Sequence, residues 1–261
     1  VCTKDSYLQK MHILDSIDNN GIFLLNTKKD KNQILKYLTN YDKNILKYLP
    51  RPHIIPWEEE GITREVMMHN DICYDPVMCG VVIPHYNIDG ELIGIRERTL
   101  IKENEENGKY KPAILNYKMY NHPLGFNLYN LNNSKQQIKN LKKVIVFEGE
   151  KSCLLYQSYF GIDNDISVAV CGSSLINYQV QLLKSCGAEE ICIAFDKQFQ
   201  ELGDDEWKRW TKKLKDINKK YGDEIQISFL FDKWNLLGYK DSPIDRGPEI
   251  FIELFNRRVV L

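Results

Sequence analysis

Two acidic residues stand directly after apolar runs, and they are the strongest indication of chemistry in this chain. Glu148 follows the run VIVF at 144–147, and Asp196 follows the run ICIAF at 191–195. Continuous β-branched and aromatic runs are typical of strands buried on both faces of a parallel sheet. Ligands bind outside the carboxyl ends of such strands, and carboxylates there are suitable ligands for a hard divalent cation. The pattern therefore predicts a Mg²⁺-dependent phosphoryl-transfer centre.

A third acid is expected near this pair, and the candidates are Asp232, Asp241 and Asp245. Each acid also has a structural explanation. Glu148 or Glu150 can stabilise the start of a helix through its dipole, and Asp196 can cap a turn. We interpret Glu150 as a helix acid and favour metal ligation for Glu148 and Asp196 as a pair. Gly149 is expected to let the chain turn tightly into the following helix.

Strand and helix patterns alternate from residue 143 onward. Strands are predicted at 143–147, 166–170, 190–195 and 225–231, and helices near 150–160, 174–186, 204–221 and 247–257. This alternation implies βαβ units and a parallel sheet. Further upstream, residues 79–100 predict a hairpin in which Asp89-Gly90 supplies the positive φ values of a tight turn. Residues 102–111 are charged and are expected to form a mobile loop.

Prolines divide the chain before this hairpin. Pro50, Pro52 and Pro56 mark a boundary, and Thr63 is a plausible N-cap for a helix that restarts after a break. We expect a helical, lysine-rich segment at 1–56, a smaller α+β subdomain with the antiparallel hairpin at 57–140, and an α/β domain at 141–261. The predicted fold class is α/β, with a parallel sheet flanked by helices.

Composition limits the classes of function. The chain has 261 residues and a net charge of -1, so any nucleic-acid surface must be a local patch. Its seven cysteines show no CxxC spacing, which gives no sign of a zinc ribbon and favours reduced thiols. There is no apolar run of the roughly 18 residues that a membrane span needs, and no signal-peptide pattern. We therefore expect a cytosolic protein without a membrane partner.

Several segments together resemble a known domain. Residues 144–152, Phe195-Asp196 and Lys240-Asp241 resemble the Toprim domain of bacterial DnaG-type primases, topoisomerases, OLD-type nucleases and some recombination proteins. The hairpin, Lys109-Tyr110-Lys111-Pro112 and residues 124–131 resemble, in order, the segments that precede Toprim in DnaG-type primases. The resemblance runs from about residue 57 to 255. It implies the RNA polymerase domain of a primase with a Toprim-like sheet. The Ile-, Lys-, Asn- and Tyr-rich composition suggests an AT-rich genome, and together with the divergent N-terminus it indicates a phage or mobile element.

The resemblance also implies roles for individual residues. Glu148, Asp196 and Asp241 would be catalytic acids that hold two divalent ions, Mg²⁺ or Mn²⁺, for nucleotidyl transfer. The implied partners are nucleoside triphosphates, a single-stranded DNA template and a replicative helicase. Side chains implied to contact the phosphates are Arg96, Arg98, Lys109, Lys151 and Lys240. From the residues alone, the preferred explanation of Arg96 and Arg98 is a solvated cross-strand pair with Glu97 or Glu91.

Two positions depart from the family pattern. Gly125 stands where the family has a basic residue before its Leu-Tyr-Gly-Leu stretch. Gln198 stands where the family has the second Asp of Asp-x-Asp, and its amide oxygen can contact a metal without adding charge. Asp204 and Asp205 are candidates to supply the negative charge that Gln198 lacks. The resemblance as a whole implies a primase catalytic core that makes short RNA primers on single-stranded DNA. Two alternatives stay open: a Toprim nuclease using the same acids, and a non-catalytic module that binds single-stranded nucleic acid, for which Gln198 is the best support.

Overall fold

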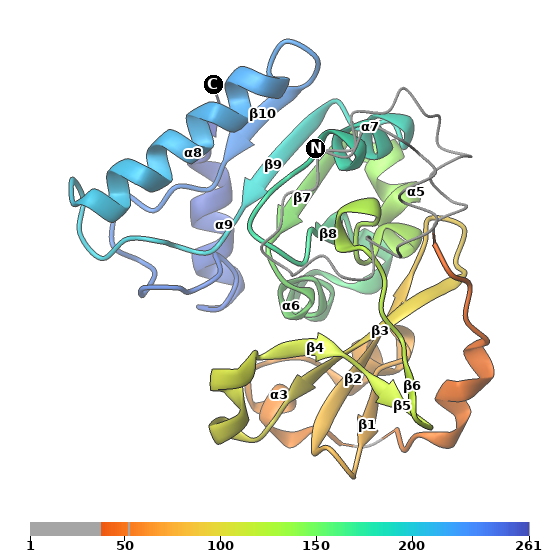
Figure 1. Cartoon of the computed structure of the whole chain (residues 1–261). Coiled ribbons are helices and arrows are strands. Elements are labelled where there is room, and N and C mark those ends of the chain that lie inside the picture. Colours follow the sequence, from red (N-terminus) through yellow and green to blue (C-terminus); the bar gives the residue numbers. More distant parts are fainter. Residues whose placement is uncertain (1–37, 52, 261) are drawn as a thin grey trace, which may run out of the picture. The chain divides into compact units, whose positions relative to one another are not determined.

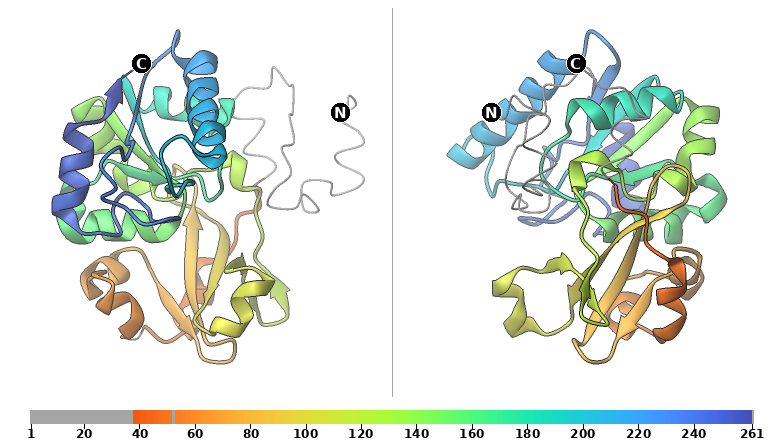
Figure 2. Two further views of the ribbon diagram at one scale, coloured as in Figure 1. Left: turned by 90° about the vertical axis from the view of Figure 1, so that its left-hand side faces the viewer. Right: turned by 45° about the vertical axis from the view of Figure 1, so that its right-hand side comes forward.

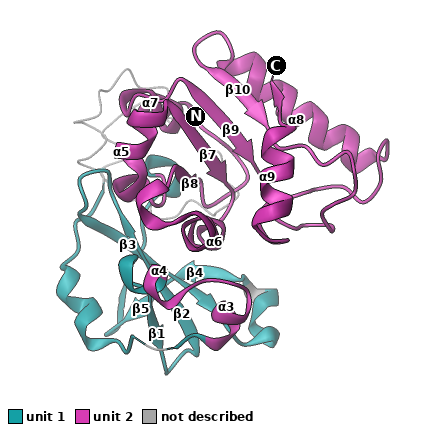
Figure 3. Ribbon diagram, turned by 180° about the vertical axis from the view of Figure 1, so that it is seen from behind, with its two compact units in different colours: residues 1–54, 67–127 teal, residues 55–66, 128–261 magenta. Residues whose placement is uncertain are grey.

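A computed structural model describes residues 38–51 and 53–260 of the chain (Figure 1). These residues form a four-stranded sheet, a five-stranded sheet and a small two-stranded sheet. One unit contains the described residues through Ile54 together with Met67–Asn127, and the other contains Ile55–Val66 with Leu128–Leu261 (Figure 3). Residues 1–37 of the predicted helical segment lie outside the described residues. The expected domains at 1–56, 57–140 and 141–261 stay a prediction.

The first unit is built on an antiparallel sheet in the order β1-β2-β3-β4, beside a small β5-β6 pair. Its core includes Leu46, Val82, Ile95 and Leu115, all of them buried. Its elements are η2 (Lys43–Tyr48), β1 (Cys73–Asp75), β2 (Gly80–Tyr86), β3 (Leu92–Thr99), η3 (Lys102–Asn107), β4 (Tyr110–Pro112), β5 (Ile114–Leu115), β6 (Lys118–Met119) and η4 (Leu124–Phe126).

The predicted hairpin is confirmed as β2 and β3, which pair from Gly80↔Thr99 to Tyr86↔Leu92. Its turn differs in detail from the expectation. Gly90 has a φ of 85°, whereas Asp89 is not among the residues with positive φ. The Asn87 side chain closes the turn instead, because its Oδ1 accepts hydrogen bonds from the backbone N–H groups of Asp89 and Glu91. Such a local side-chain turn fixes the register of the two strands.

The expectation of a mobile loop at 102–111 is wrong. This segment forms η3 and then β4, which pairs with β3 through Arg98↔Tyr110 and Glu97↔Lys111. Glu105 lies 3.4 Å from the Arg98 guanidinium and 3.6 Å from the Lys109 ammonium. The charges that made the segment look like a solvated loop therefore neutralise one another within the unit.

Two short helices, α3 (Ile55–Glu59) and α4 (Arg64–His69), follow Pro50 and Pro52, and Pro56 is the second residue of α3. The predicted break and restart is confirmed. The Thr63 hydroxyl accepts a hydrogen bond of 3.3 Å from the Val66 N–H, as an N-cap does.

The second unit confirms all four strands and all four helices predicted after residue 143. Their ends differ from the expectation by up to three residues, as in α7, which begins at Asn177 rather than at 174. The strands are β7 (Lys143–Phe147), β8 (Ser167–Ala169), β9 (Glu190–Ala194) and β10 (Gln226–Phe229), and the helices are α6 (Glu150–Phe160), α7 (Asn177–Ser185), α8 (Asp205–Tyr221) and α9 (Pro248–Asn256). Three elements were not predicted: α5 (Leu131–Leu141), η5 (Ile162–Asn164) and β11 (Val259–Val260).

The sheet of this unit runs in the order β11-β10-β9-β7-β8, with only β11 antiparallel among these strands. The connection from β7 to β8 crosses the sheet in one direction, and the next two connections cross it in the other. Because such crossovers are right-handed, α6 covers one face and α7 and α8 cover the opposite face. Figure 2 shows this layering, with α9 beside α6. Every residue of β9 is buried, as a strand covered on both faces requires.

Two further features concern the described residues. The six cysteines among the described residues are free thiols, which agrees with the expectation of reduced thiols. No helix within residues 38–51 and 53–260 is long and apolar enough to cross a membrane.

The amino ends of the central strands are fastened by Glu190, the first residue of β9. Its carboxylate accepts hydrogen bonds from the Arg258 guanidinium at 2.7 Å and the Ser228 hydroxyl at 2.6 Å, and it lies 3.0 Å from the Lys143 ammonium. Burial by itself would raise the pKa of Glu190, but these donors outweigh it and lower the pKa to about 2. The ionised form is therefore stabilised by folding.

This arrangement predicts how stability depends on pH. Because the folded pKa of Glu190 is depressed, its contribution is present above the ordinary value of 4.5 and is lost as the pH falls towards about 2. The shift corresponds to at most about 3 kcal/mol, which solvent screening reduces to about 1–2 kcal/mol. Glu190→Gln is expected to lower the free energy of unfolding by that amount at pH 7, measured by urea titration, and by much less at pH 2.5.

A suitable control is Glu189→Gln, because Glu189 is exposed and pairs with Lys142 at 3.1 Å. That variant is expected to match the wild type at both pH values. A loss at Glu190→Gln that stays constant from pH 7 to pH 2.5 would contradict the assigned network.

Candidate metal and phosphate site

The two acids of the opening pattern lie at the same edge of the sheet. β7 and β9 are adjacent parallel strands in which Phe147 pairs with Ala194. Glu148 leaves the sheet one residue after that pair, and Asp196 leaves it two residues after. Since neighbouring strands are about 4.8 Å apart, this register brings the two acids to one place at the carboxyl end.

The fold buries the side chain of Glu148, and burial is energetically unfavourable for an isolated carboxylate. Its Oε1 is buried and makes no hydrogen bond among the described residues. Burial, followed by the charge of Asp196, raises the pKa of Glu148 to about 8, although Lys213 opposes the rise. A buried carboxylate oxygen that accepts no hydrogen bond is stabilised either by a proton or by a bound cation, and Glu148 can accept either one.

Lys213 is a third member of the site that was not predicted. It lies on α8, and its ammonium is 5.3 Å from the Phe195 ring and 4.9 Å from the Trp210 ring. Burial lowers the pKa of Lys213, while the charges of Glu148 and Asp196 act in the opposite direction. The sequence carried a signal for it, because Lys213 is three residues after Trp210 and four before Ile217, two buried residues of the same helix.

Lys197 lies between Asp196 and Gln198 in the chain, and its buried side chain holds this loop in position. Its ammonium donates to the Asp232 carboxylate at 3.0 Å and to the Leu237 carbonyl at 2.9 Å, and it is only 5% exposed. Asp232 is 4% exposed and also accepts from the backbone N–H groups of residues 234, 236 and 237. Asp232, one candidate for the third acid, is therefore part of a buried ion pair that supports the loop.

The Asp241 loop lies beside the Asp196 loop. The Lys197 N–H donates to the Asp241 carbonyl at 2.9 Å, and the Lys240 N–H donates to the Lys197 carbonyl at 2.8 Å. The Asp241 carboxylate accepts from the Gly238 N–H at 2.7 Å and is ion-paired with Arg246 through the same oxygen, Oδ2. The fold thus brings the backbone of Asp241 to the site and orients its carboxylate by two donors.

The first turn of α6 is tied to the same loop. The Ser152 hydroxyl donates to the Ser242 hydroxyl at 2.9 Å, and the Lys151 ammonium lies 3.7 Å from Asp245 and forms an ion pair with Glu60. Lys151, predicted to contact phosphates, is therefore placed between two acids. The Lys240 ammonium lies 5.3 Å from the Tyr239 ring.

Two expectations about neighbouring residues need correction. Gly149 has φ -123° and ψ 160°, which any residue adopts, so no tight glycine turn follows Glu148. A Cβ there would meet nothing within 4 Å, which leaves open space beside the acid. Asp204 is the N-cap of α8, and its carboxylate accepts hydrogen bonds from the N–H groups of Trp207 and Glu201. The role of Asp204 is therefore to cap the helix and not to replace the charge missing at Gln198. Asp205 pairs with Lys208 at 3.0 Å on the exposed side of the helix.

The remaining predicted phosphate contacts belong to the first unit. Arg96 is 8% exposed, and its guanidinium lies 5.2 Å from the Tyr110 ring. Arg98 lies 5.5 Å from the same ring and donates to the Thr99 carbonyl. Lys109 is half exposed beside Glu105. The exposed pairing with Glu97 or Glu91 is not the arrangement of Arg98, whose acidic partner is Glu105.

The donor set fits a hard divalent cation. Glu148 offers an unsatisfied buried oxygen, Asp196 lies beside it, and both are carboxylates of the kind that Mg²⁺ and Mn²⁺ prefer. The loops that carry Gln198 and Asp241 border the same edge. Lys213 supplies positive charge to this edge, which partly neutralises the two acids.

A pH dependence of metal binding follows from the protonation of Glu148. Because its pKa is raised to about 8, the cation must displace a proton at pH 7. The affinity for Mn²⁺ is expected to rise about tenfold per pH unit up to pH 8 and then to level off. Calorimetry in buffers of different ionisation enthalpy measures both the affinity and the proton released. The slope is expected to vanish in Glu148→Gln, and an affinity that is flat from pH 6 to 8 in the wild type would contradict the assignment.

Comparisons with known proteins address the fold. No family model matches the chain. The SPbeta prophage-derived uncharacterized protein YorJ of Bacillus subtilis strain 168 is 35% identical over 242 residues, which are 88% of this chain and 64% of the relative. This chain therefore spans less than two thirds of that relative.

Solved structures of primases share the architecture. The zinc-binding and RNA polymerase domains of the Aquifex aeolicus primase match with a TM-score of 0.61 at 19% identity, over 90% of this chain and 63% of that chain. The DnaG primase catalytic domain bound to ssDNA matches with a TM-score of 0.59 at 18% identity, over 88% of this chain and 80% of that chain. The chain thus has the mixed α/β fold of DnaG primase catalytic cores, with a helix-flanked sheet of mainly parallel strands and an antiparallel hairpin sheet.

Proposed function

We propose that this protein is the catalytic core of a DnaG-type DNA primase, with a Toprim domain at 141–261, and that it makes short RNA primers on single-stranded DNA. The observation that carries the proposal is the pair Glu148 and Asp196 at the carboxyl edge of this particular fold, with a buried oxygen of Glu148 left without a donor. The prophage origin of the relative supports a phage or mobile-element version.

The reaction forms a bond between a 3′-hydroxyl and the α-phosphate of an incoming nucleoside triphosphate and breaks the bond to pyrophosphate. Divalent cations held by Glu148 and Asp196 would make the hydroxyl a better nucleophile and stabilise the charge of the leaving group. Glu148, whose pKa is about 8 in the protein without metal, would release its proton to solvent when it binds a cation. Asp241, held by Gly238 and Arg246, is the proposed third acid.

Basic side chains would contact the phosphates. Lys213 is the cation placed among the acids, and in this proposal it neutralises charge that develops on the transferred phosphate. Arg96, Arg98 and Lys109 from the first unit, and Lys151 and Lys240 from the second, are proposed to bind the nucleotide or the template. Gln198 would contribute an amide oxygen in place of a carboxylate.

A non-catalytic module that binds single-stranded nucleic acid is the second candidate. Gln198 and Lys213 favour it, because both make the edge less negative than two paired acids alone and so weaken the attraction for cations. A Toprim nuclease would use the same acids with water as the nucleophile.

The test is to incubate the protein with single-stranded DNA and Mg²⁺ or Mn²⁺, with and without nucleoside triphosphates. New short oligonucleotides that require the nucleotides support the primase. Shortening of the DNA without nucleotides overturns it in favour of a nuclease. Intact DNA and no product, together with salt-dependent binding that needs no metal, would favour the binding module.

A further inference from the structure

Basic residues gather on one helix of a chain whose net charge is -1. The sequence of α8, DEWKRWTKKLKDINKKY, has seven Lys and Arg residues against three acids. Lysines in the last turn are explained by the helix dipole, which favours cations there. Arg209, Lys212 and Lys213 lie in the middle of the helix, where the dipole gives no such preference. A different reason for these central cations is therefore needed.

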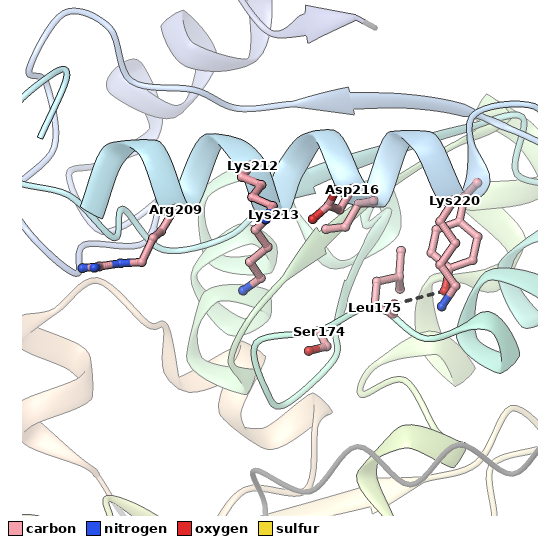
Figure 4. Close-up of a pocket in the computed structure, with 9 residues that line it drawn as sticks. Ser174, Leu175, Arg209, Lys212, Lys213, Asp216 and Lys220 are labelled. Carbon is pink, nitrogen blue, oxygen red and sulfur yellow. Dashed lines mark hydrogen bonds between the residues drawn. The ribbon is translucent and has the colours of Figure 1, made fainter. Parts of the chain in front are cut away.

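These cations line a cavity of about 330 Å³ between α8 and the segment that precedes α7 (Figure 4). Arg209, Lys212, Lys213 and Lys220 contribute its positive charge, and Asp216 is the acid among its lining residues. Figure 4 shows the cations spread along the helix, with Ser174 opposite Lys213. This cavity, called the groove below, has a net charge of +3 from these five side chains.

The groove is fixed on its second side. The Tyr221 hydroxyl donates to the Leu175 carbonyl at 3.3 Å, which joins the end of α8 to the segment before α7 (Figure 4). Tyr221 is 1% exposed and Leu175 is 5% exposed, so this contact belongs to the core. A ligand would therefore meet a wall that is already in place, which reduces the entropic cost of binding.

The spacing of the cations indicates the shape of the ligand. Lys212 and Lys220 are eight residues apart, which is about 12 Å along a helix. That length corresponds to three or four nucleotides at about 3.4 Å per nucleotide of a helical strand. A triphosphate is compact and is better held by cations that converge on one point. Cations in a row match a linear polyanion with evenly spaced phosphates.

The groove also passes the catalytic edge. Lys213 lines it and at the same time interacts with Glu148 and Asp196. A strand that follows the helix from Arg209 to Lys220 would cross beside the two acids. Lys215 and Lys219, on the same helix, do not line the groove.

We propose that the groove between α8 and residues 174–175 binds the phosphate backbone of single-stranded nucleic acid and guides the strand past Glu148 and Asp196. This assignment deepens the proposed function and rests on it for the identity of the strand. Binding in the groove needs no metal ion, because the proposed ligands for the phosphates of the strand are Arg209, Lys212 and Lys220, whereas Lys213 lies where the groove meets the two acids.

The test is a binding measurement on the full chain with fluorescein-labelled (dT)12 in EDTA, by fluorescence anisotropy over a range of salt concentrations. Lys212→Gln/Lys220→Gln removes two groove cations, and Lys215→Gln/Lys219→Gln removes two cations of the same helix outside it. Each lost phosphate contact is expected to reduce the slope of log K against log[salt] by about 0.7 for a single strand. The groove variant should therefore lose about 1.4 in slope and bind about 25-fold more weakly at 0.1 M salt.

The control variant should keep the wild-type slope and affinity. Equal losses in both variants would overturn the groove as a site, because the binding would then follow total charge alone. A groove variant that keeps its affinity for (dT)12 but loses affinity for ATP would also overturn it, in favour of a triphosphate site. If the wild type makes primers while both variants bind (dT)12 like the wild type, the groove is wrong and the primase proposal stands. No binding by the wild type overturns the groove as well.

Discussion

Replacing Glu148 by Gln is expected to abolish primer synthesis and to leave the fold intact. The carboxylate supplies the buried oxygen that the cation needs, and an amide adds no negative charge. We expect a loss of about 10³-fold or more in the rate of nucleotide incorporation. Because burial raises the pKa of Glu148 to about 8, the folded protein at pH 7 holds this side chain mostly in its neutral form. The neutral Gln is therefore expected to unfold at the same temperature or slightly higher.

Two measurements make this prediction specific. Thermal unfolding of the variant separates loss of chemistry from loss of structure. Glu189→Gln is the matched control, since Glu189 is an exposed acid at the amino end of the same sheet. It should keep full activity. Full activity in Glu148→Gln would remove the carboxylate pair from the mechanism.

Lys197→Met is expected to have the largest effect on stability. The Lys197–Asp232 pair is 3.0 Å long, and both side chains are nearly fully buried. Removal of the lysine leaves the Asp232 carboxylate buried without its cation, which typically costs about 3–5 kcal/mol. Because the backbone of Lys197 also holds the Asp241 loop, the variant should bind Mn²⁺ more weakly even where it stays folded. Urea unfolding and Mn²⁺ titration measure the two effects separately.

The chain offers a close control for this substitution. Lys208 and Asp205 form a pair of the same residue types at the same 3.0 Å, but both side chains are mostly exposed. Lys208→Met is expected to change the free energy of unfolding by less than about 1 kcal/mol. If the two substitutions cost the same, burial does not determine the strength of the Lys197 pair.

The sequence predicted those parts of the fold that depend on continuous apolar patterns. The runs at 144–147 and 191–195 became β7 and β9 because a strand buried on both faces has no polar alternation to obscure it. Helix α5 was missed for the opposite reason. Its buried positions are Leu131, Ser134 and Ile138, and a buried serine that bonds to the Asn130 carbonyl breaks the apolar periodicity. Strand β11 has two residues and no pattern to detect.

The acidic residues of the site could be predicted from the sequence, whereas its basic residues could be predicted less well. Glu148 and Asp196 follow strands, so the topology of a parallel sheet brings them together without further information. Lys213 and Lys197 act through contacts made in three dimensions, with an acid pair and with Asp232. Their types alone do not separate them from the other lysines of the chain. The charged segment at 102–111 was wrongly predicted to be a mobile loop for the same reason, because Glu105 pairs with Arg98 and Lys109 within the unit.

Extension of an annealed RNA primer tests the central claim most directly. A short labelled RNA is annealed to a single-stranded DNA template and incubated with Mn²⁺ and one nucleoside triphosphate at a time, with the wild type beside Asp196→Asn. Our account predicts that the wild type adds the nucleotide complementary to the next template base and that Asp196→Asn adds none. Extension that ignores the template base, equal extension by both proteins, or no extension by the wild type with the DNA intact would contradict it.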